Sequence, residues 1–226
     1  VIYFVSTIIF ASYLGPAKIG MFYLFESLLL IASYLSDLGI SGAIRKRISS
    51  DKSAPIYLSS GLVLKALPLI LISVTMFVFD DIVIDYIGTG NILVIILSVI
   101  LFDIYTTIKK VLEGEEKVGK SAYTTFVQRF VWGSVGFGLL VLGSPVQALL
   151  WSYILGLIVS VVYGINNIST GLTHPSWTAY KSIIEYSKFN FISSLGGFGF
   201  GWLDTALLGI LIGPTAVGLY DTAWRV

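Results

Sequence analysis

Two short stretches, LGPAKIGMFY at residues 14–23 and IGPTAVGLY at residues 212–220, share one pattern and lie near opposite ends of the chain. Both read aliphatic-Gly-Pro-x-x-aliphatic-Gly-x-aromatic, and the same offset separates every matched pair of residues. Because glycine and proline end one helix and start the next, each copy predicts a break between two helices. A repeat at a fixed spacing sets the architecture of a protein, so we expect two related halves. The matched residues are Gly15, Pro16 and Gly20 in the first copy and Gly213, Pro214 and Gly218 in the second.

The composition is typical of a membrane protein. Of the 226 residues, 56% are hydrophobic and only 12% are charged, and the mean hydropathy is +0.89. Soluble domains carry about 25% charged residues, so an ordinary soluble fold is excluded. The net charge of +1 gives no support for a nucleic-acid partner. These residues include no cysteine, which excludes disulfides and cysteine-ligated metals among them.

Both ends of the sequence interrupt apolar segments. Val1 already lies within an apolar run, with neither a Met nor the basic segment that begins a signal peptide. The residues from Asp221 onward stop partway into another expected helix. We therefore expect a piece of a longer membrane protein, with the second half cut short.

Segments long enough to cross a membrane, which takes about 20 apolar residues, recur along the chain. We predict the end of a first span, six further spans and the start of an eighth, at residues 1–14, 17–38, 55–79, 91–108, 121–142, 146–166, 188–212 and from 214 onward. Loops are predicted at residues 80–90 and 109–120, and a helix on the membrane surface within residues 167–187. The expected fold is an all-α, polytopic membrane bundle, with an amino-terminal lobe of six spans at residues 1–187 and the start of a carboxy-terminal lobe at residues 188–226.

The loop charges predict the orientation in the cell membrane. Loops that follow even-numbered spans carry ten Lys and Arg residues, whereas the opposite loops carry only Lys18. Because positive loops stay in the cytoplasm, the amino ends of odd-numbered spans are expected there. Six spans separate the two Gly-Pro copies, so both halves enter the membrane in the same sense. Such parallel repeats are related by an axis along the membrane normal.

Four charged residues fall inside predicted spans: Lys65, Arg129, Glu26 and Asp204. A charge at the bilayer centre costs at least ~2.5–3.5 kcal/mol, so such side chains face protein or a wet cavity. Helical spacing places them on stripes of small or polar residues, which indicates that they turn inward.

Two interpretations of these charges stay open. In the first, Lys65 or Arg129 pairs with Glu26 or Asp204 and only holds the bundle together. In the second, the two bases line a central cavity and hold an anion such as a phosphate. Two further acids lie nearer the span ends, and we expect each to pair with bases close to it in sequence. These acids are Asp37, near Arg45, Lys46 and Arg47, and Asp103, near Lys109 and Lys110.

No catalytic or metal-binding motif stands out. Asp80, Asp81 and Asp85 form an acidic group that could bind a hard cation, but three carboxylates in a short outer loop are more often simply solvated. The sequence contains no phosphate-binding Gly-x-x-x-x-Gly-Lys-[Ser/Thr] loop, no His-Glu-x-x-His and no Gly-x-Ser-x-Gly. We therefore expect no metal, no cofactor and no enzymatic activity.

Several of these motifs together resemble the polysaccharide-transporter family. They are Leu14-Gly15-Pro16 through Gly20-Met21-Phe22, Leu35-Ser36-Asp37-Leu38-Gly39-Ile40, Arg45-Lys46-Arg47-Ile48-Ser49, and later Trp202-Leu203-Asp204 and Gly213-Pro214 through Gly218-Leu219-Tyr220. This family contains flippases for O-antigen and other lipid-linked oligosaccharides and belongs to the MATE-like MOP superfamily. The resemblance covers essentially the whole chain. It implies a MATE-like bundle of two lobes, which works by alternating access around a central cavity.

The resemblance implies a flippase that moves a polyprenyl-(di)phosphate-linked oligosaccharide from the cytoplasmic to the outer leaflet. Lys65 and Arg129 would hold the phosphate, because Arg offers a planar fork and Lys a point charge. The prenyl tail would stay among the membrane lipids. Glu26 and Asp204 are candidate residues for coupling to a proton or a sodium ion.

Two other functions stay open. A MATE-type drug or cation antiporter needs acids rather than bases at the cavity centre. A membrane glycosyltransferase would use the group Asp80, Asp81 and Asp85 with a divalent metal, and would also need a large outer domain that these residues do not contain.

Overall fold

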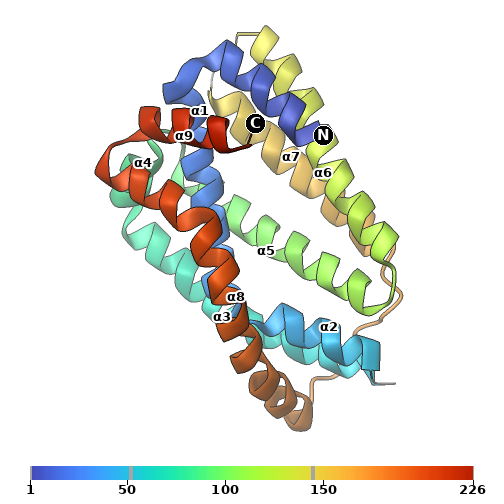
Figure 1. Cartoon of the computed structure of the whole chain (residues 1–226). Coiled ribbons are helices and arrows are strands. Elements are labelled where there is room, and N and C mark those ends of the chain that lie inside the picture. The colour runs from blue at the N-terminus through green and yellow to red at the C-terminus, as the bar shows by residue number, and fades with distance from the viewer. Residues whose placement is uncertain (1, 51–52, 144–145, 226) are drawn as a thin grey trace.

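A computed structural model of the chain describes residues 2–50, 53–143 and 146–225, and for residues 194–201 it describes the backbone alone. In these ranges the structure is helical and contains no strand (Figure 1). The helices are α1 (Ile2–Asp37), α2 (Ile40–Ser50), α3 (Ala54–Val78), α4 (Asp80–Ile87), α5 (Ile92–Gly114), α6 (Val118–Val141), α7 (Val146–Ile165), α8 (Trp177–Leu211) and α9 (Pro214–Arg225). The all-α class predicted from the composition is confirmed.

Four of the described helices, α1, α3, α5 and α7, are long and apolar enough to cross a membrane. α6 and α8 have the length of a span, with 24 and 35 residues. Their sequences are more polar, and α6 carries both Gln128 and Arg129 near its middle. The protein is therefore a multi-pass membrane protein. The number of spans in each lobe and the orientation of the chain stay predictions.

The first Gly-Pro copy bends a helix instead of opening a loop. α1 consists of two helices joined at a kink, where Gly15 has a non-helical backbone with φ 76° and ψ 170° and Pro16 follows it. Glycine adopts such a positive φ without the steric cost that other residues carry. The first two predicted spans are consequently the two arms of one bent helix, drawn in blue in Figure 1.

The two Gly-Pro copies pack against each other, although almost the whole chain separates them. α9 lies along the bend of α1 (Figure 1). A Cβ placed on Gly20 would overlap the carbonyl oxygen of Pro214, and a Cβ on Gly218 would overlap that of Pro16. Glycines allow helix backbones to approach closely in membrane proteins. The glycine of each copy thus leaves room for the proline carbonyl of the other copy.

Three predicted boundaries were wrong, and each error has a local reason. The predicted acidic loop contains helix α4, with Asp80 and Asp81 in its first turn, where carboxylates favour the positive end of the helix dipole. α5 continues through the predicted loop to Gly114, where Lys110 and Glu113 pair three residues apart. The predicted surface helix after residue 176 and the seventh span form one continuous helix, α8.

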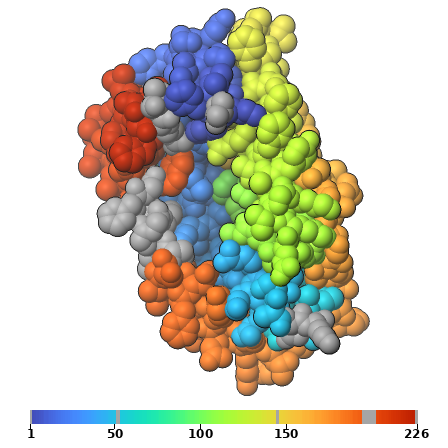
Figure 2. Space-filling model, turned by 45° about the vertical axis from the view of Figure 1, so that its right-hand side comes forward, coloured from blue at the N-terminus to red at the C-terminus, as the bar shows by residue number. Residues whose placement is uncertain are grey.

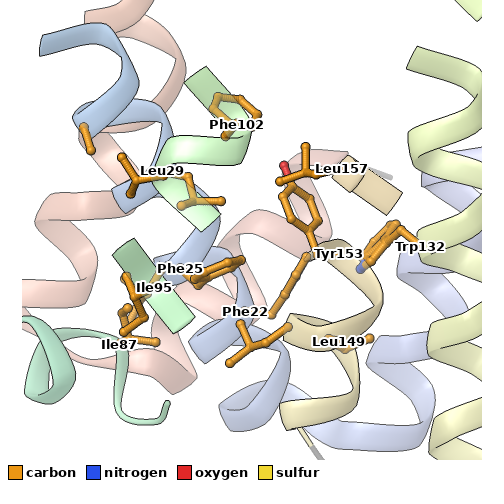
Figure 3. Packing of buried hydrophobic residues seen from close by; sticks show 14 of the residues in the cluster. Phe22, Phe25, Leu29, Ile87, Ile95, Phe102, Trp132, Leu149, Tyr153 and Leu157 are labelled. Carbon is orange, nitrogen blue, oxygen red and sulfur yellow. The ribbon is translucent and has the colours of Figure 1, made fainter. Parts of the chain in front are cut away.

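An aromatic cluster joins α1, α6 and α7 in the centre of the bundle (Figure 3). Trp132 is fully buried, stacks on Phe22 with ring centroids 5.1 Å apart, and meets Phe10 edge-on at 5.0 Å. Tyr153 of α7 packs edge-on against Phe22 and Phe25. Such ring pairs add about 0.5–1.5 kcal/mol each beyond the area they bury. The cluster fixes α6 against the second arm of α1.

Residues 166–176, which connect α7 to α8, are anchored by side chains of the preceding helices. The Glu115 carboxylate accepts the backbone N–H groups of Ser169 and Thr170, at 2.6–3.0 Å. Farther along, the Ser59 and Ser60 hydroxyls of α3 accept the N–H groups of Thr173 and Ser176. We call residues 166–176 the connector.

We expect Glu115→Gln to loosen the connector. Burial by itself would raise the pKa of Glu115, but hydrogen bonds from Lys117, Thr170 and Ser169 outweigh it and lower that pKa below its ordinary value. The carboxylate therefore stabilises the fold above its unfolded-state pKa of about 4.3, and this stabilisation is lost as the pH falls through the lower folded-state value. Hydrogen exchange should accelerate at the amides of Ser169 and Thr170 in the variant at pH 7. In the unmodified protein the protection of these amides, after correction for the intrinsic effect of pH on exchange, should fall only in acid. Equal protection in both proteins at pH 7 would contradict the prediction.

Candidate functional site

Lys65, near the middle of α3, has its ammonium group inside a cage of oxygen atoms. Its Nζ lies 2.9 Å from Oδ1 of Asp37 and 3.0 Å from Oδ1 of Asp103. It also lies 2.9 Å from the hydroxyl of Ser41 and 2.6 Å from that of Thr107. We call these five side chains the Lys65 cluster. It ties together α1, α2, α3 and α5.

The Lys65 cluster is buried and carries more negative than positive charge. The side chains of Lys65 and Asp103 are 3% and 5% exposed, and that of Asp37 is 22% exposed. Among the described residues, no ion pair joins another cation to Asp37 or Asp103. Two carboxylates and one ammonium leave the cluster with a formal charge of −1.

The pairing of Asp37 and Asp103 corrects the sequence-based expectation. Neither acid pairs with the bases near it in sequence, because both turn toward Lys65. Asp37 also accepts the backbone N–H of Ser41 at 3.1 Å, and so caps the first turn of α2. The chain reaches this geometry through two successive left-handed residues, Leu38 (φ 48°) and Gly39 (φ 79°), the second of which adopts this conformation without steric cost.

A pocket of about 510 Å³ borders the Lys65 cluster between α3, α5 and the connector. Its polar lining residues are Lys65, Asp103, Thr107 and Thr170, and most of the remaining lining is aliphatic. Asp37 does not line this pocket. The cluster is therefore accessible from the pocket through Asp103, while the exposed part of Asp37 meets a different space.

Arg129, near the middle of α6, forms a second buried charged group with Glu26 of α1. Its Nη1 lies 3.9 Å from Oε1 of Glu26, and its guanidinium carbon lies 3.9 Å from the centre of the Tyr3 ring. The Tyr3 hydroxyl donates to Oε2 of Glu26 at 2.6 Å. The Nη1 atom is buried and has no hydrogen-bond partner among the described residues. The guanidinium thus has N–H groups that no described residue accepts.

A pocket of about 520 Å³ opens beside Arg129, lined also by Ile2, Tyr3, Thr125 and Phe126. The Arg129 side chain is 32% exposed, in contrast to 4% for Glu26. Figure 2 shows that α6 forms one wall of a recess on this face of the molecule, opposite α8 and α9. An anion that enters the pocket would meet the guanidinium edge before it meets the carboxylate.

Asp204 of α8 joins neither cluster. Its carboxylate accepts the hydroxyl of Tyr220 and the backbone N–H of Thr205. The next residue, Thr205, donates its hydroxyl to Asp221, which is 2% exposed. Of the four predicted intramembrane charges, the structure therefore pairs Arg129 with Glu26, pairs Lys65 with two other acids, and places Asp204 at the contact of α8 with α9.

Several residues of these clusters were missed by the sequence-based prediction. Ser41 and Thr107 carry no charge, and Tyr3 resembles the other aromatic residues of an apolar helix. Asp221 lies near the end of the chain, where no periodic pattern could be followed. The signal that could have identified Thr107 is its spacing of four residues from Asp103, which places both side chains on one face of α5.

The acidic group Asp80, Asp81 and Asp85 gains no support as a metal site. The part of the chain that the structure describes contains no group of three or more His, Asp or Glu side chains arranged to hold a metal ion. Asp80 accepts the backbone N–H of Asp81, an ordinary contact at the start of a helix.

Comparison with known proteins supports the family expected from the sequence motifs. The family model described as "Polysaccharide biosynthesis protein" matches residues 1–226. The chain is 37% identical over 223 residues to the "Probable low-salt glycan biosynthesis flippase Agl15" of Haloferax volcanii, and 26% identical over 227 residues to the "Probable flippase AglR" of the same organism. These matches cover 99% and 98% of this chain and 47% of each relative. The chain therefore spans about half the length of these curated relatives.

The fold matches solved multidrug resistance transporters of the MATE family. The inward-facing conformation of one such transporter of the MOP superfamily superposes with a TM-score of 0.74 at 18% identity, covering 99% of this chain and 57% of the transporter. An outward-facing conformation gives a TM-score of 0.68 at 19% identity, covering 99% and 55%. The MATE-like bundle implied by the motifs is thus confirmed. The match of the family model along the whole chain shows that the protein belongs to the polysaccharide biosynthesis protein family.

Proposed function

We propose that the protein is a flippase that moves a polyprenyl-(di)phosphate-linked oligosaccharide from the cytoplasmic to the outer leaflet by alternating access. Family membership and the two flippase relatives support this class of function. Outward movement of an anion across a membrane that is negative inside is favourable by about 2.3 kcal/mol per charge per 100 mV. In this proposal residues 1–187 form the first lobe, residues 188–226 begin the second, and neither needs a cofactor.

The observation that carries the proposal is that Nη1 of Arg129, although 3.9 Å from the Glu26 carboxylate, has no hydrogen-bond partner among the described residues and belongs to a side chain that lines a pocket. A phosphate oxygen that accepts from this guanidinium would satisfy a buried donor and place negative charge over the guanidinium fork. Tyr3 supports the site, because its ring lies under the guanidinium and its hydroxyl holds Glu26. We therefore assign the phosphate contact to Arg129.

Lys65 gives this proposal less support than Arg129. Two carboxylates already surround its ammonium group, so an approaching phosphate would meet a cluster whose formal charge is negative. Glu26 and Asp204 stay candidates for coupling to a proton or sodium ion. Glu26 is held by Tyr3, and Asp204 by Tyr220.

Arg129→Gln in the full-length protein, expressed from its gene and reconstituted in vesicles, should slow translocation of a lipid-linked oligosaccharide by about 10- to 100-fold. This range corresponds to the loss of about 1.5–3 kcal/mol for a hydrogen bond to a charged group. Arg129→Lys should keep part of the rate, because the charge remains but the planar fork is lost. The measurement is the fraction of labelled substrate that becomes accessible to an external modifying enzyme.

Arg45→Gln serves as the matched control, since Arg45 is half-exposed and pairs with Glu113 at the end of α5. It should leave the rate of translocation within twofold. Equal rates for Arg129→Gln and the control would remove Arg129 from the phosphate site.

A cation antiporter of the MATE type is the second candidate, favoured by the observation that Lys65 is paired with acids. That function requires an acid facing an open cavity, whereas Glu26 is only 4% exposed. Uptake of an organic cation, compared in the same vesicles with translocation of the lipid-linked sugar, decides between the two functions.

A further inference from the structure

We propose that the Lys65 cluster is a proton-binding site, and that its proton controls how firmly Asp37 holds the first turn of α2. The proposal rests on the geometry of the cluster and does not depend on the identity of the transported substrate. It concerns Asp37 and Asp103, not the acids Glu26 and Asp204 that the sequence analysis singled out for ion coupling.

The Lys65 cluster contains two carboxylates but only one ammonium group. The Oδ1 atoms of Asp37 and Asp103 both lie within 3.0 Å of one ammonium group. The charged groups that act on Asp103 are Lys65 of α3 and Asp37 of α1. α2 contributes the hydroxyl of Ser41, and α5 contributes that of Thr107. With both carboxylates ionised, the cluster therefore carries a net charge of −1 that no further ion pair among the described residues balances, and its Asp103 carboxylate is only 5% exposed.

The excess negative charge raises the free energy of the folded protein. An uncompensated buried charge is strongly unfavourable, and two carboxylates that share a site relieve it by keeping one proton between them. Lys65 can stabilise one carboxylate fully but has to divide its charge between two. The proton then titrates as a property of the pair and not of one residue. The pocket beside Asp103 gives this proton a way in and out.

Asp37 links the proton to the contact between the two halves of the chain. Asp37 caps α2 through the N–H of Ser41, and it immediately precedes the left-handed pair Leu38 and Gly39. Gly39 lies against the backbone of Ser187 and Phe191 of α8, and Asn190 of α8 donates to the carbonyl of Gly39 at 3.1 Å. These α8 groups are uncharged, so they do not compete for the proton. A proton shared between the two carboxylates weakens the cap that Asp37 supplies, which loosens α2 at the place where it meets α8.

Asp103→Asn in the full-length protein tests the charge count, because it removes the excess negative charge at every pH. At pH 8 the variant should melt at a temperature about 1–2 °C higher than the unmodified protein, a shift that corresponds to about 1 kcal/mol for a chain about twice as long as this one. The difference should shrink as the pH falls toward 5, because the unmodified cluster then takes up its proton.

Glu26→Gln is the matched control, since Glu26 is equally buried but belongs to a pair with balanced charges. It should lower the melting temperature at both pH values. A lower melting temperature for Asp103→Asn at pH 8, or a difference that does not change with pH, would overturn the proposal. If Asp103→Asn does not accumulate, Asp37→Asn removes the same charge and is expected to show the same dependence of stability on pH.

Hydrogen exchange tests the link to α2. After correction for the intrinsic effect of pH on exchange, the amides of α2 should exchange faster at pH 5 than at pH 8 in the unmodified protein. Asp103→Asn should abolish this difference, because the variant lacks the excess negative charge that binds the proton. Equal protection of α2 at the two pH values in the unmodified protein would show that the proton does not reach the junction.

Discussion

Lys65→Met should lower the free energy of unfolding by about 3–5 kcal/mol, the usual consequence of removing one partner from a buried ion pair. The methionine side chain fills a similar volume, so the effect comes from the carboxylates of Asp37 and Asp103 that lose their shared cation. Thermal unfolding of the full-length protein in detergent measures the loss. The decrease should be larger at pH 8 than at pH 5, because protons can replace the ammonium group only in acid.

The triple variant Lys65→Met, Asp37→Asn, Asp103→Asn distinguishes the effect of charge on stability from the effect of packing. Replacing every member of a buried ionic cluster by neutral groups is often nearly neutral for stability. We therefore expect the triple variant to recover most of the lost melting temperature. If it stays as unstable as Lys65→Met alone, the Lys65 side chain acts through packing and the charge argument is wrong.

Gly20→Val and Gly218→Val should each prevent α9 from docking on α1. The added Cβ would overlap a backbone carbonyl, that of Pro214 or Pro16, which cannot move aside as a flexible side chain can. The helices would have to separate along their whole contact, which also includes the approach of Tyr23 to Thr222. We expect loss of protection from hydrogen exchange throughout α9 and a loss of translocation of at least tenfold in the full-length protein.

Gly138→Ala provides the matched control for both glycine variants. Gly138 lies in α6, and no atom lies close enough to meet an added Cβ. Alanine should leave the stability unchanged or raise it by up to about 1 kcal/mol, because alanine favours helix more than glycine does. If Gly20→Val and Gly218→Val behave like Gly138→Ala, the two Gly-Pro copies do not form a tight contact.

The sequence predicted the helical framework well because each Gly-Pro copy acts locally. A glycine with positive φ before a proline bends a helix whatever surrounds it, so the break at Gly15 follows from the residues themselves. That Gly20 and Gly218 meet each other's prolines could not be predicted, because it depends on how α9 folds back across the bundle. The boundaries of α4 and α5 were also missed, since charged residues were taken for loops although they extend helices. For α8, a surface helix and a span were predicted separately, whereas they form one helix.

The buried charges, too, were predicted only in part from the sequence. Their presence inside spans and their inward direction followed from the cost of a charge in hydrocarbon, and the pairing of Arg129 with Glu26 was one of the open interpretations. The partners of Asp37 and Asp103 were assigned to neighbouring bases, because proximity in sequence was the only guide. Their true partner, Lys65, comes within reach only after the turn at Leu38 and Gly39 directs α2 across α3 and α5.

The anchored connector has a mechanical consequence for the two halves. Hydrogen bonds that backbone N–H groups of residues 169–176 donate to Ser59, Ser60 and Glu115 hold this segment against the first half, up to the residue before α8 begins. The first turn of α8 therefore travels with the first half as one rigid piece. If the halves rock against each other, α8 acts as a lever whose fulcrum lies at Trp177, and its far end, next to α9, sweeps the widest arc.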